Sequence, residues 1–313
     1  MNIWSYIFRR ILYVIPVILG VCFIIFFIFN VCAPDPAQSL LGKHATLQQM
    51  EEVRRELGLN KPYWEQYIDI VKSAFTFDFG RSWQTKQEII EMIKLGAVPS
   101  MTMTVPAFVI STILAIIISL MVSFFRGSAL DRVTVITCVA LMSIPSLAYI
   151  LFGQWFFAYE LGLFEISGYE SGFPYFVPYI ILPVTIWVFL AIGPDVRFFR
   201  TVMLDEVYQD YVRTARAKGL SEKKILFKHI LKNAMIPIIT YVIIQIPFLI
   251  LGALLLESFF SIPGLGAMTI TAVNASDFPV IKAMTVLSAV AYIIFTIITD
   301  VLYTVVDPRI RLK

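Results

Sequence analysis

The sequence predicts an all-α protein that crosses a membrane six times, and three observations support this prediction. Hydrophobic residues make up 58% of the 313-residue chain and charged residues only 15%. The mean hydropathy is +0.80, which lies outside the range of a water-soluble domain, because the surface of such a domain needs far more charge. The charged residues that are present leave six long uncharged windows between them.

Each of these windows is long enough for a helix that crosses a bilayer, which needs about 20 apolar residues. The predicted spans are 11–33, 96–125, 133–159, 171–194, 233–256 and 283–306, the last interrupted only by Asp300. A seventh uncharged window, 258–276, contains Pro263, Gly264 and Gly266. Because lipid tolerates no unpaired backbone groups, we interpret it as a loop or re-entrant element outside the hydrocarbon.

The distribution of Lys and Arg predicts how the chain is oriented. Sixteen of the 25 lie in the N-terminal tip, the second and fourth connections and the C-terminal tail. On the other side, the two short connections hold only Lys282, and the long segment 34–95 carries little weight because loops of that length translocate largely regardless of charge. Both termini are therefore predicted to be cytoplasmic.

The spans divide the chain into four parts. Residues 1–33 form the N-terminal tip and the first span, 34–95 an external segment, 96–306 a core of five spans, and 307–313 a cytoplasmic tail. In the external segment, LQQMEEVRRELGL and YWEQYIDIVKSAF have helical spacing, and Gly58 ends the first of them. This segment is either an inert cap over the membrane domain or a docking surface for a delivery protein.

The chain offers little for catalysis or metal binding. Cys22, Cys32 and Cys138 all lie within predicted spans, so we interpret them as small apolar residues rather than as a disulfide or metal site. The sequence has no G-x-x-x-x-G-K-[ST] pattern that could cradle phosphates. We therefore predict that the chain has no catalytic residue, no cofactor and no metal.

The connection 195–232 collects nine of the basic residues and has a helical pattern. Apolar residues spaced three and four apart predict one apolar face on a helix over 204–218: Leu204, Tyr208, Tyr211, Val212 and Ala215. Arg213, Arg216 and Lys218 fall mainly on its other faces. Gly219 follows where a left-handed backbone is easiest, and Leu220 can pack back on the preceding turn.

A second helix begins directly after this corner. Ser221 offers its side-chain oxygen as an N-cap, Glu222 stands in the first turn, and the helix continues towards the fifth span. Such a rigid corner suits insertion into a groove of another protein. A plain basic loop that fixes topology and contacts anionic lipid is the alternative, whereas a nucleic-acid patch is disfavoured by the net charge of only +3.

The region after the fifth span combines an acid with a Pro-Gly-Leu-Gly turn. Irregular backbone at membrane depth is tolerated only against protein or water. We therefore interpret this region as lining the outer mouth of a pathway, with a simple outer connection as the alternative. The candidate residues are Glu257, Phe260, Pro263, Gly264, Gly266 and Asp277.

The residue order around Gly219 resembles the cytoplasmic loop signature of ABC-importer membrane subunits, which is EAA, three residues, Gly, nine residues and I-x-L-P. Arg213, Thr214 and Ala215 occupy the first triplet, and Leu231 matches the Leu. His229 and Lys232 replace the Ile and the Pro. This departure is similar to the peptide/nickel branch, whose version DYVRTARAKGL stands at 210–220.

The resemblance covers nearly the whole chain, and it is closest to the B-type subunit of dipeptide and oligopeptide permeases. The further matching motifs are Arg9 and Arg10, LGLNKPYWEQY at 57–67, FGRS at 79–82, SIP at 143–145, RFFR at 197–200, ESFFSIPGLG at 257–266, DFP at 277–279 and DPRIRL at 307–312. One such motif alone would be weak, but all of them in order are specific.

The resemblance implies a type I ABC-importer transmembrane domain in a bacterial inner membrane. The loop around Gly219 would be the coupling helix, seated in a cleft of a separate ATPase that holds the ATP and Mg²⁺. The residues that match this loop are Asp210, Tyr211, Arg213, Thr214, Ala215, Arg216, Lys218, Gly219 and Leu220.

The implied partners are a homologous C-type permease, two ATPase subunits, an extracytoplasmic peptide-binding protein and membrane lipid. The implied substrate is a di- or oligopeptide, with nickel chelates, haem or another small solute as alternatives. A six-span ion-coupled carrier or channel is the rival class. It would need charged or carbonyl-rich residues along a pore, and beyond Asp300 the spans offer none.

Overall fold

The computed structural model describes residues 3–32, 35–41, 46–56 and 58–306. These residues form helices and no strand, so the all-α class is confirmed. Among them, five helical stretches are long and apolar enough to cross a membrane, and there are six if one pair of helices bent by 88° is taken as a single span. The predicted tail 307–313, with the DPRIRL motif, lies outside the described residues, as does the boundary predicted at residues 33 and 34.

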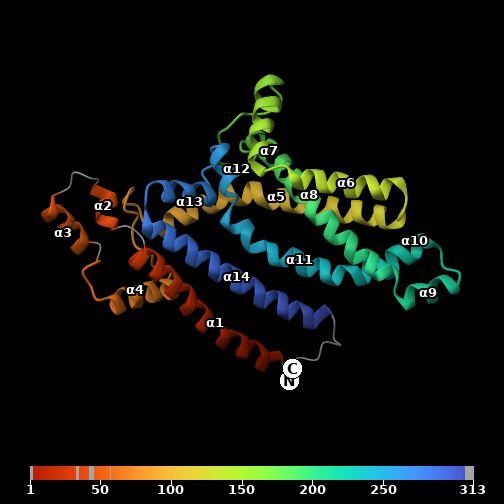
Figure 1. The fold of residues 1–313 in the computed structure, drawn as a ribbon, viewed down its shortest axis with the longest axis horizontal. Helices are drawn as coiled ribbons and strands as arrows, with labels where there is room; N and C mark the ends of the chain where they lie inside the picture. The colour runs from red at the N-terminus through yellow and green to blue at the C-terminus, as the bar shows by residue number, and fades with distance from the viewer. Residues whose placement is uncertain (1–2, 33–34, 42–45, 57, 307–313) are drawn as a thin grey trace.

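The long helices lie side by side as one bundle (Figure 1). The helix α5 packs most extensively against α8, α11 lies between α8 and α14, and α1 packs on α14 at one side of the bundle. The spanning elements are α1 Ile3–Phe26 with the π-helical η1 Phe27–Cys32, α5 Ile89–Phe124, α6 Ala129–Ser143, α7 Ser146–Phe152 with η2 Gly153–Glu160, α8 Val177–Val207, α11 Leu231–Leu251 and α14 Phe278–Val306.

The third predicted span is a bent helix. It breaks after Ser143, and the stretch from Ser146 to Glu160 leaves at 88° to α6, so that α7 stands away from the bundle in Figure 1. Pro145 explains the break because proline disfavours the α conformation of the residue before it, and Ile144 is extended with φ −90° and ψ 126°.

Other predicted boundaries are also corrected, because charged residues inside the helices have partners. The helix α8 continues thirteen residues past the predicted end at 194. It does so because Asp195 is buried and accepts a hydrogen bond of 2.9 Å from the Tyr241 hydroxyl on α11. The helix α5 begins at Ile89 instead of residue 96, since Ile89 and Ile93 are buried against α13 and α14.

The window 258–276, which the sequence predicts to be a loop or re-entrant element, contains most of a helical hairpin. The short helix α12 Leu254–Phe259 is followed by α13 Leu265–Asn274. The ten residues of α13 span about 15 Å, which is too short to cross a bilayer. This length agrees with the prediction that the window is not a span, and the helical hairpin corresponds to the re-entrant alternative rather than to a loop; it lies beside one end of the bundle (Figure 1).

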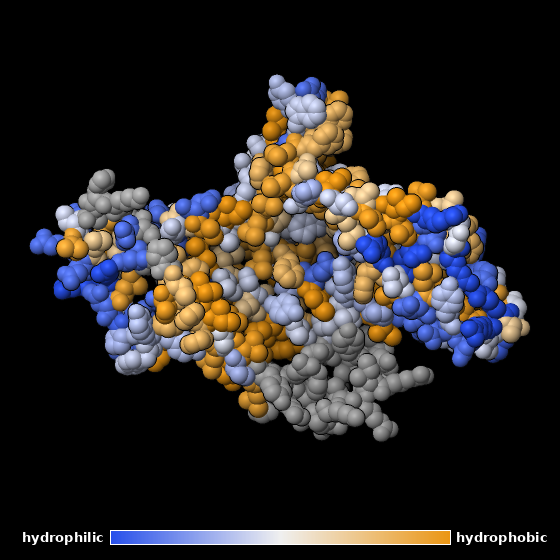
Figure 2. Space-filling view, viewed as in Figure 1, coloured by the Kyte–Doolittle hydropathy of each residue, from blue (hydrophilic) through white to orange (hydrophobic). Residues whose placement is uncertain are grey.

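Among the described residues between the first two spans are three short helices, one more than predicted: α2 Pro36–Leu41, α3 Leu47–Glu56 and α4 Tyr63–Thr76. Gly58 adopts φ +67° just after α3, as predicted for a helix stop. At the opposite end of the bundle stand α9 Asp210–Ala217 and α10 Glu222–Ile225, with the π-helical η3 Leu226–Ile230 leading into α11. Figure 2 shows hydrophilic residues gathered at these two ends and hydrophobic residues between them.

Candidate functional site

The candidate site at one end of the bundle is the elbow, which we define as α9, α10 and residues 218–221 between them. The predicted single helix over 204–218 is wrong, because α8 ends at Val207 and α9 begins at Asp210. Tyr208 is consequently 64% exposed rather than part of the apolar face. The Arg126 guanidinium lies 5.3 Å from the centroid of the Tyr208 ring.

Gly219 makes the corner in the way the sequence predicts. Its φ is +74°, in the left-handed region that side chains other than glycine rarely adopt. The Gly219 amide donates to the Arg216 carbonyl at 2.9 Å, and the Leu220 amide donates to the Ala215 carbonyl at 3.3 Å. These bonds satisfy the last carbonyls of α9 and fix the angle at which the chain turns. Leu220 packs back on the core cluster around it, as predicted.

A charged pair closes the elbow. The Arg216 guanidinium donates two hydrogen bonds to the Glu222 carboxylate, at 2.8 and 3.2 Å. Ser221 occupies the N-cap position of α10, but its side chain makes no capping hydrogen bond, so that part of the prediction is wrong. A planar guanidinium paired with both oxygens fixes direction as well as distance. The pair therefore ties α9 to α10 across the corner.

The inner face of the elbow is continuous with the spans. Val212 is 0% exposed, and Ala215 is also buried; both belong to a core cluster that includes residues of α5, α8 and α11. Tyr211 donates a hydrogen bond to the Glu206 carboxylate. Burial raises the pKa of Tyr211 to about 12, and the nearby Glu206 carboxylate contributes to the shift, so the phenol stays protonated. The buried face of α9 is therefore part of the same packed core as α5, α8 and α11.

The outer face of the elbow is polar and open. Asp210, Arg213, Thr214 and Lys218 are exposed, and the Asp210 and Arg213 side chains lie 3.5 Å apart at the surface. No atom lies within 4 Å of the point where a Cβ on Gly219 would stand. The elbow thus presents a stiff, basic projection with a glycine at its tip, which is suited to a groove on another protein.

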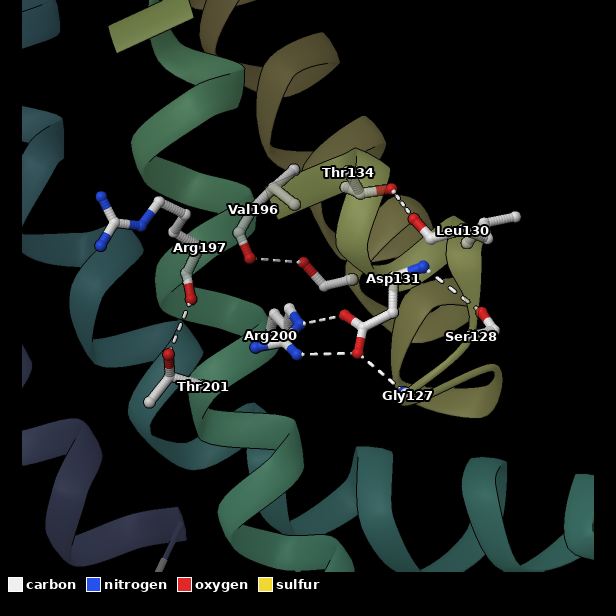
Figure 3. Close-up of polar contacts among 10 residues, drawn as sticks. Gly127, Ser128, Leu130, Asp131, Thr134, Val196, Arg197, Arg200 and Thr201 are labelled. Carbon is white, nitrogen blue, oxygen red and sulfur yellow. Dashed lines mark hydrogen bonds and ion pairs between the residues drawn. The ribbon is translucent and has the colours of Figure 1, made fainter. Parts of the chain in front are cut away.

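A partly buried ion pair behind the elbow joins α6 to α8 (Figure 3). The Arg200 guanidinium donates to the Asp131 carboxylate at 2.7 and 3.0 Å, and the Gly127 amide donates to the same carboxylate at 2.9 Å. Ser119 adds a hydrogen bond of 3.1 Å to the Val196 carbonyl. This network keeps the ends of α5, α6 and α8 in register beside the elbow.

At the opposite end of the bundle, the Glu257 carboxylate holds the α12–α13 hairpin in place. Glu257 is 0% exposed. One oxygen accepts from the Ser100 hydroxyl at 2.8 Å and the Ala253 amide at 2.9 Å, and the other accepts from the Gly266 and Ala267 amides at 2.7 and 3.1 Å. We call Glu257, Ser100 and these amides the carboxylate clamp.

The glycines around the clamp are required for space. A Cβ on Gly252 would stand 2.1 Å from the Glu257 Oε1 atom, and one on Gly264 would stand 2.3 Å from Oε2. A Cβ on Gly266 would stand 2.8 Å from the Leu254 amide nitrogen. The Pro-Gly-Leu-Gly sequence therefore has a packing reason, because the backbone must approach a buried carboxylate closely.

Asp277 tethers the chain before α5 to the junction of α13 and α14. Asp277 is 3% exposed, and it accepts hydrogen bonds from the Ser82 hydroxyl and, at 3.1 Å, from the Trp83 amide. A cavity of about 540 Å³ opens beside this tether. It is lined by residues of α5, α13 and 84–87, among them Gln84, Gln87, Thr271 and Met268.

Of the six residues predicted to line the outer mouth, three line the cavity and three are buried behind its wall. Pro263, Gly264 and Asp277 do line the cavity. Glu257 and Phe260 are fully buried, and Gly266 is buried as well. These three support the wall of the cavity instead of facing it, because their polar and apolar groups are used to hold the hairpin.

The sequence did not predict the contact of Ser100 with Glu257 or the ion pair of Asp131 with Arg200. Ser100 stands among small and hydroxyl residues in an uncharged window, and nothing in its neighbourhood points to Glu257, which lies 157 residues away. Asp131 and Arg200 gave a signal, since both are charges at the ends of predicted spans. Their spacing in the sequence does not indicate that they meet.

Comparison with known proteins identifies the family. Residues 111–312 match the family described as the binding-protein-dependent transport system inner membrane component. Residues 3–104 match the N-terminal region of the membrane components of such systems. The chain belongs to this family. The permease is thus a multi-pass inner-membrane subunit of an ABC importer.

Two relatives cover the permease from end to end. The glutathione transport system permease protein GsiC of Shigella flexneri serotype 5b (strain 8401) is 32% identical over 309 residues, which is 99% of each chain. GsiC of Escherichia coli (strain K12) is also 32% identical over 309 residues, again with 99% of each chain covered.

The carboxylate clamp predicts that Glu257→Gln lowers the stability of the permease. The glutamine nitrogen would face backbone N–H donors, and a buried group left without a partner costs about 1–3 kcal/mol. We expect Glu257→Gln to have a lower unfolding temperature in detergent than the wild type, and Ser100→Ala to have a lower unfolding temperature as well. Glu91→Gln, on the exposed side of α5, is the matched control. Equal unfolding temperatures for Glu257→Gln and the wild type would contradict the clamp.

The partly buried ion pair predicts a loss of the same order in Asp131→Asn. The variant keeps the size of the side chain but removes the charge that faces Arg200, whose side chain is 23% exposed. Thermal unfolding in detergent measures the effect, and Asp205→Asn on the exposed face of α8 serves as the comparison. Equal unfolding temperatures for Asp131→Asn and Asp205→Asn would show that the ion pair contributes nothing to stability.

Proposed function

We propose that the permease carries short peptides across the inner membrane, driven by separate ATPase subunits that dock on the elbow. The observation that carries this proposal is the elbow itself: a basic, exposed corner at Gly219 whose buried face is packed on the spans. A partner that displaces α9 would move α8 and α11 with it. The sequence DYVRTARAKGL, which resembles the peptide/nickel branch, occupies this corner.

The proposed assembly has four further components. A homologous C-type permease encloses the path together with this chain, two ATPase subunits hold ATP and Mg²⁺, and an extracytoplasmic binding protein delivers the substrate. Both termini and the elbow face the cytoplasm, as the Lys and Arg distribution predicts. ATP must then bias the equilibrium between an inward-facing and an outward-facing state. A nearly complete shift from one state to the other requires that ATP bind the two states with free energies that differ by about 5.5 kcal/mol.

A peptide substrate has two independent supports. The permease resembles the B-type subunits of dipeptide permeases, and its relatives are named as glutathione transport permeases. Glutathione is itself a tripeptide, so a short peptide satisfies both comparisons. The cavity beside Asp277, at the end of the bundle away from the elbow, is lined in part by Gln84 and Gln87. The Gln84 amide donates to the Ala275 carbonyl at 3.0 Å, and Gln87 brings a second side chain that can pair with peptide groups. Nickel chelates or haem are the alternative cargo.

The docking proposal is tested by purification. The permease, extracted from its own membrane with a mild detergent, is expected to retain an ATPase subunit. Because Arg213 is exposed at the elbow, reversal of its charge in Arg213→Glu should reduce the retained amount, whereas Lys94→Glu at the other end of the bundle should not. Recovery of the ATPase at wild-type level with Arg213→Glu and with Lys218→Glu would exclude the elbow as the docking site.

Substitutions of Gly219 separate coupling from folding. Because no neighbour would contact a Cβ there, Gly219→Val acts only through the left-handed backbone, which a β-branched residue opposes by about 1–2 kcal/mol or more. Asparagine tolerates that backbone, so Gly219→Asn is the matched control. We expect Gly219→Val to insert normally but to lose peptide uptake and its stimulation of ATP hydrolysis, and Gly219→Asn to keep both. Unchanged uptake in Gly219→Val would contradict the coupling role.

A further inference from the structure

The helix α4 carries an apolar surface that faces away from the protein. Its inner face packs on α1, where the Tyr67 hydroxyl donates to the Leu19 carbonyl at 3.1 Å and Ala74 is buried. A second apolar face stays open: Trp64 is 63%, Ile68 52% and Phe75 53% exposed. Residues 64, 68 and 75 lie on one side of a helix. Exposure of this stripe to water would forgo about 1.5–3 kcal/mol for each side chain.

Charged residues on α4 are arranged around this stripe in a way that fits a membrane surface. Lys72 is exposed next to the stripe on the helical wheel, and the half-buried Glu65 lies close to Lys72 at the same border. Asp69 lies farther round and pairs with Lys61 at 2.6 Å. A lysine stem can lie along apolar surface while its ammonium group reaches the phosphate level. Apolar residues on one side, with charged residues of both signs from the border onward, are typical of a helix that lies in the membrane interface.

A groove between α1 and α4 shows how far along the apolar span of α1 this surface lies. It encloses about 510 Å³ and is lined by Leu19, Gly20, Phe23 and Phe26 of α1 and by Tyr63, Trp64 and Tyr67 of α4. Its α1 wall lies within the apolar span Val14–Cys32. Phe23 is nine residues before the end of that span, which places it about 13 Å inside the apolar stretch along the helix.

The groove is continuous with the lipid-facing surface of α1. Phe23 is 56% and Ile24 58% exposed, on a helix whose composition requires a bilayer around it. A polar chain fixes α4 beside this surface, because the Lys282 ammonium donates to Asn30 at 2.8 Å and the Asn30 amide donates to Gln66 of α4 at 2.5 Å. Trp64 is therefore held next to the apolar surface of α1.

We propose that α4 is an interfacial helix and that an acyl chain of a membrane phospholipid occupies the groove between α1 and α4. The stripe Trp64, Ile68 and Phe75 lies against the leaflet at this end of the bundle, with Lys72 at the headgroup phosphates. This proposal does not depend on the transported substrate. It also restricts the docking of a delivery protein on 34–95 to surfaces other than the apolar stripe of α4.

Tryptophan fluorescence tests the proposal. The chain has five tryptophans, Trp4, Trp64, Trp83, Trp155 and Trp187. A full-length variant that retains only Trp64, with Phe at the other four positions, is placed in nanodiscs of phosphatidylethanolamine and phosphatidylglycerol whose acyl chains carry bromine. We expect Trp64 to lose most of its emission relative to unbrominated lipid. The variant that retains only Trp83 is the control, because Trp83 packs edge-on against Phe278 with centroids 5.7 Å apart and is expected to lose little.

A second measurement keeps the test decisive if the single-tryptophan chains do not fold. In the otherwise native permease, Trp64→Phe should remove part of the emission that brominated lipid quenches, and Trp83→Phe should leave that part unchanged. The proposal is overturned if Trp64 is quenched no more than Trp83. It is also overturned if Trp64 is open to iodide in nanodiscs and becomes shielded only when an extracytoplasmic binding protein is added, since a protein would then be the occupant.

Discussion

A bilayer offers no hydrogen-bond partners, so a chain that leaves helical geometry at membrane depth must bring its own. The permease meets this constraint where α11 ends at Gly252. The Glu257 carboxylate accepts the amides of Ala253, Gly266 and Ala267 and the hydroxyl of Ser100, which water would otherwise satisfy. Three glycines make room for the carboxylate. The α12–α13 hairpin can therefore stand as a fixed wall beside the cavity at Asp277.

The opposite end of the bundle meets the same constraint in a different way. There the chain leaves the spans before it turns, and Gly219 turns it where solvent and a partner can reach the backbone. Arg216 and Glu222 close the corner, and Asp131 and Arg200 hold the helices behind it. The two ends are joined by the packed helices α8 and α11.

The sequence predicts the fold class, most of the spans and the conformation of Gly219, because uncharged length and glycine chemistry are local properties. It fails where a distant partner changes the rule. The fourth predicted span ends just before Asp195, yet α8 continues because the Tyr241 hydroxyl donates a hydrogen bond to the Asp195 carboxylate. Glu257 reads as a lining residue, yet Ser100 and three amides bury it. Pro145 stands at the break in the third span, but a proline alone does not specify the angle of 88° between the two parts.

The central claim is that this chain moves peptide only when a separate nucleotide-driven subunit occupies the elbow. Uptake of a labelled peptide into proteoliposomes tests it most directly, with the permease pair, the binding protein and ATP present and the ATPase subunits either included or omitted. We expect accumulation with the ATPases and none without them. Accumulation without the ATPases, whether driven by an ion gradient or by diffusion, would contradict it and would place the chain among carriers or channels.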